Sequence, residues 1–254
     1  MTRMRPLTCH PIPGLPLVHP GDDLAALLAT AIRDAGLTLE ARDVVVVCQK
    51  VVSKAEGRIV DLATVTPSAF ASRIALQTDK DPRIVEVILR ETTRIVKMAD
   101  GHLICETGPG WICANAGIDE SNTARADSVT LLPVDADASA ERLRAALSTD
   151  AGGATIGVVI TDTFGRPWRD GLVDIALGVA GVGALLDFLG ATDLGGRELH
   201  HTVLALGDEV AAAAGMLMDK GSGIAAVVVR GVPWERTRGR GRDLIRPSAL
   251  DLFR

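Results

Sequence analysis

The chain has 254 residues but no tyrosine, and its four phenylalanines and three tryptophans bring the aromatic share to only 3%. Hydrophobic residues nevertheless make up 47% of the sequence, so the core has to be built from alanine, valine, leucine and isoleucine. This length is enough for one large domain or two small ones. The scarcity of aromatic rings argues against recognition of nucleic-acid bases by stacking.

The sequence also lacks an excess of positive charge and a long apolar run. Its formal net charge of −5 gives no support to a nucleic-acid or anionic-membrane partner. The most apolar stretch, 172–189, contains Asp174 and Asp187, and its uninterrupted part is too short to cross a bilayer. Residues 1–18 have no continuous apolar region of the kind that a signal peptide needs. We therefore expect a soluble protein.

Cysteines are few, and the common catalytic motifs are absent. The four cysteines, at positions 9, 48, 105 and 113, form no CxxC pair, which excludes the usual zinc sites and small disulfide frameworks. Cys48 and Cys105 stand in apolar runs, where a cysteine usually behaves as a small core residue. This usage favours a reducing, intracellular compartment. No Walker A, GxSxG or HExxH pattern occurs, so the P-loop and common hydrolase classes are not supported.

What is present centres on residues 156–171, IGVVITDTFGRPWRDG. The apolar run 156–160 predicts a buried strand, and Gly165 and Pro167 predict a loop beyond it. At the exit of the strand, Asp162 and Thr163 supply the oxygen ligands that magnesium or manganese prefers. Arg166 and Arg169 suit a phosphate or a carboxylate. The alternative is an Asp–Thr cap of a helix or turn followed by solvated arginines.

A second buried strand is predicted at 43–48, DVVVVC, and polar residues follow it directly. Ligands of open α/β sheets gather beyond strand ends, so Lys50 and Lys54 are candidates for contacts with phosphate oxygens. Both could equally be solvated lysines at a sheet edge.

Two further polar loops complete the candidate set. Residues 115–122, NAGIDESN, place Asp119, Glu120 and Asn122 close enough for two of them to face one cation, although a solvated turn fits equally well. Residues 218–223, MDKGSG, combine glycine amides with a lysine and could cradle a phosphate. Together with the strand ends, these loops suggest a metal-assisted phosphoryl-transfer site for a nucleotide.

The remaining pattern predicts mixed helices and strands. Helices are expected at 22–35, 67–77, 82–96, 139–147 and 198–218, and strands at 102–106, 111–114, 128–132, 173–183 and 224–230.

Several motifs resemble the coenzyme F420-0:L-glutamate ligase family. They are GLPLV at 14–18, HPGDDL at 19–24, QKVVSKAEGRIV at 49–60, GWICANAGIDESN at 110–122, ITDTFGRPWRDG at 160–171, VVVRG at 227–231 and LIRPSALDLFR at the end of the sequence. They span nearly the whole chain in the order that the family shows.

The resemblance implies a cytoplasmic, GTP-dependent amide ligase that adds L-glutamate to the side-chain carboxylate of a deazaflavin coenzyme. Magnesium or manganese, with potassium, would be the cofactors. The implied architecture is an α+β fold of mixed sheets with flanking helices, in which two interlocked subdomains form an intertwined homodimer. Residues 1–254 would be a single catalytic domain, without the C-terminal reductase domain that some members carry.

The resemblance also implies roles for individual residues. Asp119, Asp162 and Thr163 would be metal ligands, and Lys54 would act with the two aspartates in catalysis. Nucleotide contacts would come from Leu15, Pro16, Leu17, Val18, Gln49, Lys50, Lys54, Asn122 and the turn Met218, Asp219, Lys220, Gly221, Ser222, Gly223. Lys220 stands where some members have a metal-binding glutamine, so either this lysine contacts phosphate or one metal site is altered.

Two other functional classes remain open. The same carboxylates would serve a metal-dependent phosphatase, and the same loops would serve a nucleotide-binding regulatory module without chemistry.

Overall fold

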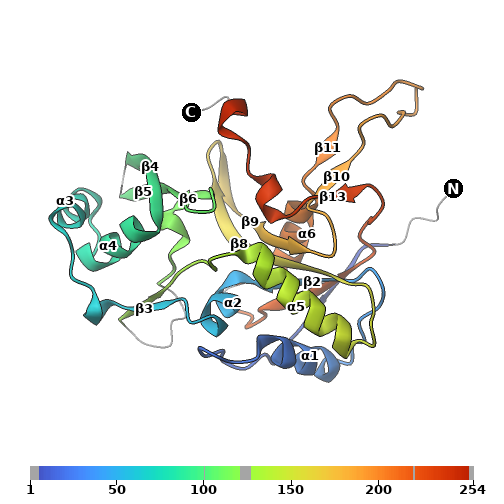
Figure 1. Ribbon diagram of the computed structural model, residues 1–254, viewed down its shortest axis with the longest axis horizontal. Helices are drawn as coiled ribbons and strands as arrows, with labels where there is room; N and C mark the ends of the chain where they lie inside the picture. The colour runs from blue at the N-terminus through green and yellow to red at the C-terminus, as the bar shows by residue number, and fades with distance from the viewer. Residues whose placement is uncertain (1–5, 100, 121–126, 220, 252–254) are drawn as a thin grey trace.

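The computed structural model describes residues 6–99, 101–120, 127–219 and 221–251 (Figure 1). Its helices are α1 (Leu24–Asp34), α2 (Gln49–Ala55), α3 (Ala69–Thr78), α4 (Pro82–Glu91), α5 (Ala136–Asp150) and α6 (Leu206–Gly215), with 3-10 turns η1 (Leu62–Thr64), η2 (Asn115–Gly117), η3 (Gly241–Leu244) and η4 (Ser248–Leu250). Its strands are β1 (Thr8–Pro11), β2 (Val44–Cys48), β3 (Ile59–Asp61), β4 (Thr92–Ala99), β5 (His102–Thr107), β6 (Ile112–Ala114), β7 (Ser128–Thr130), β8 (Gly157–Arg166), β9 (Arg169–Ala180), β10 (Leu185–Asp187), β11 (Val203–Leu204), β12 (Ala226–Arg230) and β13 (Thr237–Arg238). This mixture of helices and several sheets confirms the α+β class.

The central sheet has the strand order β1–β12–β2–β8–β9. Strands β2 and β8 run parallel, whereas the other neighbouring pairs in this sheet are antiparallel. Cys48 at the end of β2 lies opposite Thr161 of β8. Because parallel strands end at the same edge of a sheet, the polar residues after β2 and those at the end of β8 are brought together.

Strand β2 is apolar throughout because both of its faces are covered. Val45 and Val47 belong to the cluster that includes α1 and α5, while Val44 and Val46 pack in the cluster that includes α6. Figure 1 shows α1 and α5 in front of the sheet and α6 behind it. Burial on two faces explains the unbroken valine run, as the sequence predicted.

A second hydrophobic core lies within residues 60–131. It gathers apolar residues from α3, α4, β5 and β7, among them Ile74, Val85, Ile88, Leu103 and Val129. In Figure 1 this part, with the sheet β4–β5–β6, stands at the left of the central sheet. A smaller cluster of Cys113, Leu132, Phe164 and Leu177 joins residues of this part to β8 and β9.

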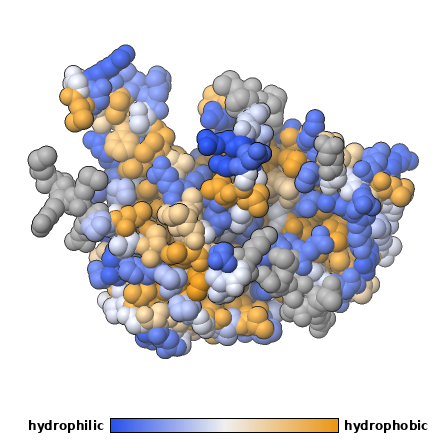
Figure 2. Space-filling view, turned by 180° about the vertical axis from the view of Figure 1, so that it is seen from behind, coloured by the Kyte–Doolittle hydropathy of each residue, from blue (hydrophilic) through white to orange (hydrophobic). Residues whose placement is uncertain are grey.

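The small sheet β11–β10–β13 forms a third unit at the right of Figure 1. Figure 2, seen from behind, shows apolar and polar residues mixed over the rear face. Among the described helices, none combines the length and apolar character needed to cross a bilayer.

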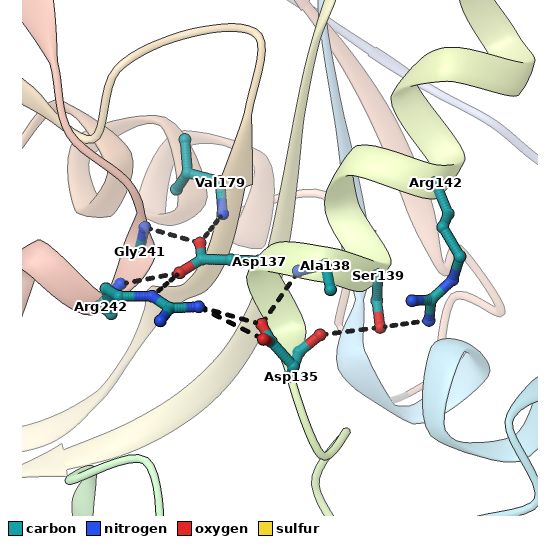
Figure 3. Close-up of polar contacts among 8 residues, drawn as sticks. All are labelled: Asp135, Asp137, Ala138, Ser139, Arg142, Val179, Gly241 and Arg242. Carbon is teal, nitrogen blue, oxygen red and sulfur yellow. Dashed lines mark hydrogen bonds and ion pairs between the residues drawn. The ribbon is translucent and has the colours of Figure 1, made fainter.

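A buried carboxylate ties the C-terminal part to the centre of the molecule (Figure 3). Asp137, in the first turn of α5, accepts hydrogen bonds from the backbone amides of Val179, at 2.9 Å, and Gly241, at 2.8 Å. It also accepts a bond from Arg242 Nε at 3.0 Å, and Arg242 reaches Asp135 as well. One side chain therefore holds three segments that are distant in the sequence.

Two predicted helices differ from the observed elements. The helix predicted to run to residue 96 ends at Glu91, and β4 follows at once. The β-branched residues Thr92, Thr93, Ile95 and Val96 suit a strand, and β4 pairs with β5. The helix predicted from 198 begins only at Leu206, because residues 203–204 form β11 instead.

The strand predicted at 156–160 is longer than expected, and of the two residues predicted to form a loop only Pro167 lies in the turn, whereas Gly165 is still in the strand. Strand β8 continues through Asp162 and Phe164 to Arg166, which pairs with Arg169 of β9. Pairing with β9 along this whole length extends the strand beyond the apolar run. The helix predicted at 139–147 is longer, spanning Ala136–Asp150, with Asp135 as its N-cap.

Candidate functional site

The candidate site lies where the parallel strands β2 and β8 end. Helix α2 begins directly after β2 with Gln49 and Lys50, and Asp162 lies in β8 one residue beyond Thr161. Asp119 reaches the same region from another part of the chain. Its backbone exchanges two hydrogen bonds with Thr130, at 3.0 and 2.9 Å.

Lys50 and Asp119 form a direct ion pair. The distance from Lys50 Nζ to Asp119 Oδ2 is 2.7 Å, with the side chains 16% and 29% exposed. This partial burial limits screening by water, so the pair carries more electrostatic weight than a surface salt bridge. A lysine proposed for phosphate and an aspartate proposed for metal are thus neighbours in space.

Asp162 lies in the electrostatic field of this pair. The pKa of its carboxyl is raised to about 7, chiefly by burial and also by the negative charges of Asp119 and Asp174, against the lowering effects of a hydrogen bond from the Thr163 amide and of the Lys50 charge. The structure therefore brings Asp119 and Asp162 together. Asp162 lies inside a strand that continues past it, so it does not cap a helix or turn.

Alternation along β8 separates Asp162 from Thr163. Ile160 packs in the cluster with α1 and α5, and Val159 packs in the cluster with α6. Since side chains alternate between the two faces of a strand, Asp162 lies on the same face as Ile160, and Thr163 lies on the same face as Val159. The two predicted metal ligands therefore face opposite sides of the sheet.

On the α6 side, Thr163 meets Asp174 of β9. Thr163 Oγ1 donates a hydrogen bond to Asp174 Oδ1 at 2.6 Å, and the two residues are register partners. Gly215, at the end of α6, lies so close that a Cβ there would be 2.6 Å from Asp174 Oδ2. Asp174 thus lies between Thr163 and the segment that leads to the 218–223 turn.

The chain before Asp119 has an uncommon backbone. Asn115, Ala116 and Gly117 all have positive φ angles, of 53°, 53° and 73°. Such angles are unfavourable for residues other than glycine, and strained residues of this kind concentrate at functional sites. In addition, Asn115 Oδ1 is buried without a hydrogen-bond partner in the described structure.

Lys54 and Gln49 are both buried on α2. Burial, with the nearby charge of Lys50, lowers the pKa of the Lys54 ammonium. Gln49 accepts a hydrogen bond from Ser53 Oγ at 2.9 Å, whereas its Nε2 is buried without a described partner. The alternative of solvated lysines does not hold for Lys54, which is 8% exposed.

The predicted nucleotide loops have mixed surroundings. In the 15–18 loop, Leu17 is exposed and Val18 is buried in the α1 core. In the 218–223 turn, Asp219 Oδ1 accepts hydrogen bonds from the amides of Gly221, at 2.7 Å, and Ser222, at 2.8 Å. The predicted contacts Asn122 and Lys220 lie outside the described residues.

Arg166 and Arg169 lie at the tip of the β8–β9 hairpin. Both are exposed, and Arg166 Nη2 donates to the backbone oxygen of Asp170 at 2.6 Å. The cation that lowers the pKa of Asp162 is Lys50, on α2.

Two thiols border the carboxylates. Burial raises the pKa of Cys48 to about 11 and that of Cys113 to about 12, and the charge of Asp162 raises both. Because the thiolate is the reactive form of cysteine, these groups are inert core residues near neutral pH.

The carboxylates of Asp119 and Asp162 suit a divalent cation whose remaining ligands are water and substrate oxygens. Among the described residues, no three His, Cys, Asp or Glu side chains converge into a metal cluster. Magnesium sites commonly use one or two carboxylates together with water and phosphate oxygens. The negative charges of Asp119 and Asp174 both disfavour ionisation of Asp162, and a bound cation would offset this repulsion.

A cavity of about 550 Å³ lies between the second core and the N-terminus of α5. Its lining includes Arg58, Trp111, Pro133, Leu177 and Arg242, but none of the residues predicted for metal or nucleotide. Trp111 and Leu177 also belong to the cluster that contains Phe164, two residues after Asp162.

Sequence reasoning missed Asp174 and the backbone conformation of 115–117. Asp174 could have been found from the β8–β9 hairpin. Because β8 extends to Arg166, which pairs with Arg169, Thr163 lies opposite Asp174. The Asn-Ala-Gly sequence was noted only for its polar atoms and its glycine.

Comparison with known proteins defines the class. The sequence model of the F420-0:gamma-glutamyl ligase family matches residues 14–231. A coenzyme F420:L-glutamate ligase of Methanopyrus kandleri is 46% identical, with 98% of each chain covered. The proteins of that name from Methanothermobacter thermautotrophicus and Archaeoglobus fulgidus are each 44% identical over 96% of this chain and cover 97% and 95% of their own lengths.

The fold and these relatives define an α+β enzyme of the ligase class. The chain belongs to the F420-0:gamma-glutamyl ligase family.

Proposed function

We propose that this enzyme adds L-glutamate to the side-chain carboxylate of coenzyme F420-0 at the expense of GTP. The names of the relatives, coenzyme F420:L-glutamate ligases, support the acceptor and the amino acid. The nucleotide follows from the family resemblance of the sequence and from the pairing of carboxylates with lysines at the site.

The chemistry requires activation of a carboxylate, which is a poor electrophile. An oxygen of the coenzyme carboxylate attacks the γ-phosphorus of GTP, the bond to the β-phosphate oxygen breaks, and GDP leaves. The product is an acyl phosphate. The amine of glutamate then attacks the acyl carbon to give a tetrahedral intermediate. Loss of a proton from its nitrogen and cleavage of the bond to the phosphate oxygen release inorganic phosphate and leave the amide.

The residues of the chain have separate roles in this scheme. Asp119 and Asp162 would hold one divalent cation, Mg²⁺ or Mn²⁺, and Thr163 would contribute a ligand to a second. When bound, the cations neutralise phosphate charge and align the leaving group. Lys54 stabilises negative charge that develops on the transferred phosphoryl group. Lys50 holds Asp119 in place through their ion pair.

The observation that carries the proposal is the convergence of Asp119 and Asp162 beside Lys50 at the shared end of β2 and β8. The test mixes the protein with GTP, Mn²⁺, L-glutamate and the deazaflavin acceptor, and follows GDP release and product mass. We expect GDP release that depends on glutamate and a product heavier by one or more glutamyl units.

Controls separate the rival functions. Asp162→Asn should reduce GDP release at least about 100-fold, a loss typical of removing electrostatic stabilisation of a transition state. Asp170→Asn, at the exposed tip of the same hairpin, should leave it unchanged. Phosphate release without glutamate would indicate a metal-dependent phosphatase, and nucleotide binding without turnover would indicate a regulatory module.

The assembly and the remaining cofactor also belong to this proposal. We infer a cytoplasmic homodimer in which residues 1–254 form one catalytic domain with two interlocked subdomains. The β8–β9 hairpin supports the dimer alone, because it projects from the sheet (Figure 1) with the apolar side chains of Trp168 and Leu172 70% and 64% exposed. Potassium as an additional cofactor stays a prediction.

A further inference from the structure

On the α6 side of β8, the Thr163 hydroxyl donates a hydrogen bond to Asp174, and this bond fixes the direction of the hydroxyl proton. Thr163 Oγ1 and Asp174 Oδ1 are 2.6 Å apart, and the hydroxyl is the donor. A hydroxyl has one proton and two lone pairs. When the proton points at Asp174, both lone pairs point elsewhere and are free to interact with an electron-pair acceptor.

We propose that Asp174 is a positioning residue for cation binding: it fixes the Thr163 hydroxyl proton and so directs a lone pair of Thr163 toward a divalent cation. This inference rests on the proposed function, because it takes Thr163 as a cation ligand. It goes beyond that function by assigning a role to a residue outside the predicted site. Partners that orient a metal ligand in this way commonly contribute 10- to 100-fold to metal affinity.

The position of Asp174 is itself fixed from two sides. Its backbone is paired with Thr163 across the hairpin. The second oxygen of its carboxylate abuts Gly215, where a Cβ would lie only 2.6 Å away. Gly215 has no Cβ, so α6 can end against the carboxylate, and the same contact sets the start of the segment leading to the 218–223 turn.

A role of Asp174 as a hydrogen-bond acceptor differs from a role as a general source of negative charge. If Asp174 acted only through its charge, an asparagine would lose as much as an alanine. If it acts as a hydrogen-bond acceptor, the carbonyl oxygen of asparagine can take the same proton. The conservative variant therefore separates the two roles.

The experiment titrates the purified protein with Mn²⁺ and measures free Mn²⁺ by electron paramagnetic resonance. The Thr163-dependent part of the binding is the difference between the wild type and Thr163→Val. We expect Asp174→Ala to weaken this part at least tenfold and Asp174→Asn to weaken it less than threefold. Asp170→Ala, a carboxylate at the hairpin tip, is the matched control and should bind as the wild type does.

A double-mutant cycle gives the decisive readout. The Thr163→Val/Asp174→Ala protein should bind Mn²⁺ within twofold of Thr163→Val alone, because Asp174 acts through Thr163. Gly215→Ala, which pushes on the carboxylate without removing it, should reduce the same part of the binding. This second route keeps the test valid if Asp174→Ala is poorly folded.

The outcomes are distinguishable. Additive losses in the cycle, or wild-type affinity in Asp174→Ala, would overturn the positioning role while leaving the proposed function in place. Equal Mn²⁺ binding by the wild type and Thr163→Val would remove Thr163 as a ligand, and the inference would fall with it. A wild type that binds no Mn²⁺ at all would contradict the cation sites of the proposed function.

Discussion

The charge of the candidate site depends on the pKa of Asp162, which neighbouring groups shift in opposite directions. Asp162 is partly buried in a strand, with Asp119 and Asp174 raising its pKa and Lys50 lowering it. Near neutral pH the group is therefore poised between its protonated and ionised forms. A cation competes with the proton for the same oxygens, so the site should bind metal and release a proton together.

This balance predicts a pH dependence of metal binding. Asp162 has a pKa of about 7 without metal, so below that pH a bound proton has to be displaced. We expect the Asp162-dependent Mn²⁺ affinity to fall about tenfold for each pH unit below 7 and to level off above it. Isothermal titration calorimetry between pH 5.5 and 8, in buffers of different ionisation enthalpy, measures both the affinity and the proton release.

The Asp162→Asn variant is the control for this profile, since it removes the titrating group and should bind weakly at every pH. A wild-type affinity that changes less than twofold over the same range would contradict the assignment of the proton to Asp162.

At this scale the sequence predicted some residues and missed others for a clear reason. Asp119 and Asp162 could be chosen because each stands among oxygen-bearing side chains beside an apolar run. Asp174 could not, because its importance comes from Thr163, eleven residues away, through the hairpin register. The side chain of Gln49 is fully buried and accepts a hydrogen bond from Ser53, and its contact with the nucleotide stays a prediction.

At the scale of single elements, hydrophobic periodicity in the sequence predicts a helix or strand correctly where burial of its own apolar residues decides its conformation. The unbroken run of β2 and the helix at 24–34 were both predicted from pattern alone. The failures lie where pairing with a distant strand decides the outcome. The second half of β8 is polar, and it is a strand because β9 pairs with it through Arg166. Likewise, β4 replaces the end of a predicted helix because β5 lies beside it.

The turn η2 shows what an element contributes to the site. Its left-handed residues bring Asp119 to the ion pair with Lys50, and Gly117 packs against Leu132 with no room for a side chain. A Cβ on Gly117 would lie 2.6 Å from the Leu132 side chain.

Replacing Gly117 by alanine should therefore destabilise the protein through two effects. The positive φ angle costs about 1 kcal/mol for a residue with a Cβ, and overlap with Leu132 adds about 1–3 kcal/mol. The free energy of unfolding, measured by urea denaturation, should fall by the sum of the two. We also expect weaker Mn²⁺ binding, since Asp119 follows two residues later.

Gly152→Ala is the matched control. Gly152 also has a positive φ angle, of 66°, but no atom lies within 4 Å of the position that its Cβ would take. This variant should lose only the backbone cost, about 1 kcal/mol. Equal losses for the two variants would show that packing against Leu132 does not constrain the turn.

On the scale of the whole molecule, the site lies where separately built parts meet. Strands β2 and β8 come from the central sheet, whereas Asp119 comes from the segment 60–131 that builds the second core, directly after Ile118 of that core. The cluster of Cys113, Leu132, Phe164 and Leu177 joins these parts close to Asp162. Sequence periodicity predicts each core separately, but it contains no information on how the two cores are oriented.

Asp137 is the clearest single contribution to this larger arrangement. Its side chain is only 5% exposed and bonds to β9, to η3 and to the Arg242 guanidinium (Figure 3). Removing it would take this acceptor away from the backbone amides of Val179, Gly241 and Arg242 and from the half-exposed Arg242 guanidinium. Such losses are large, because buried groups that lose a partner are not rehydrated.

We expect Asp137→Ala to lower the free energy of unfolding by about 3 kcal/mol and to speed proteolysis within residues 231–251, which the carboxylate holds to the sheet. Asp150→Ala is the control on the same helix, since Asp150 forms an exposed ion pair with Arg33 and should contribute less than about 1 kcal/mol. Urea denaturation measures the stability, and mass spectrometry of timed tryptic fragments locates the first cleavage. If Asp137→Ala were cut first in the hairpin at 188–202, the C-terminal segment would be held by its other contacts. The buried carboxylate would then stabilise only the N-terminus of α5.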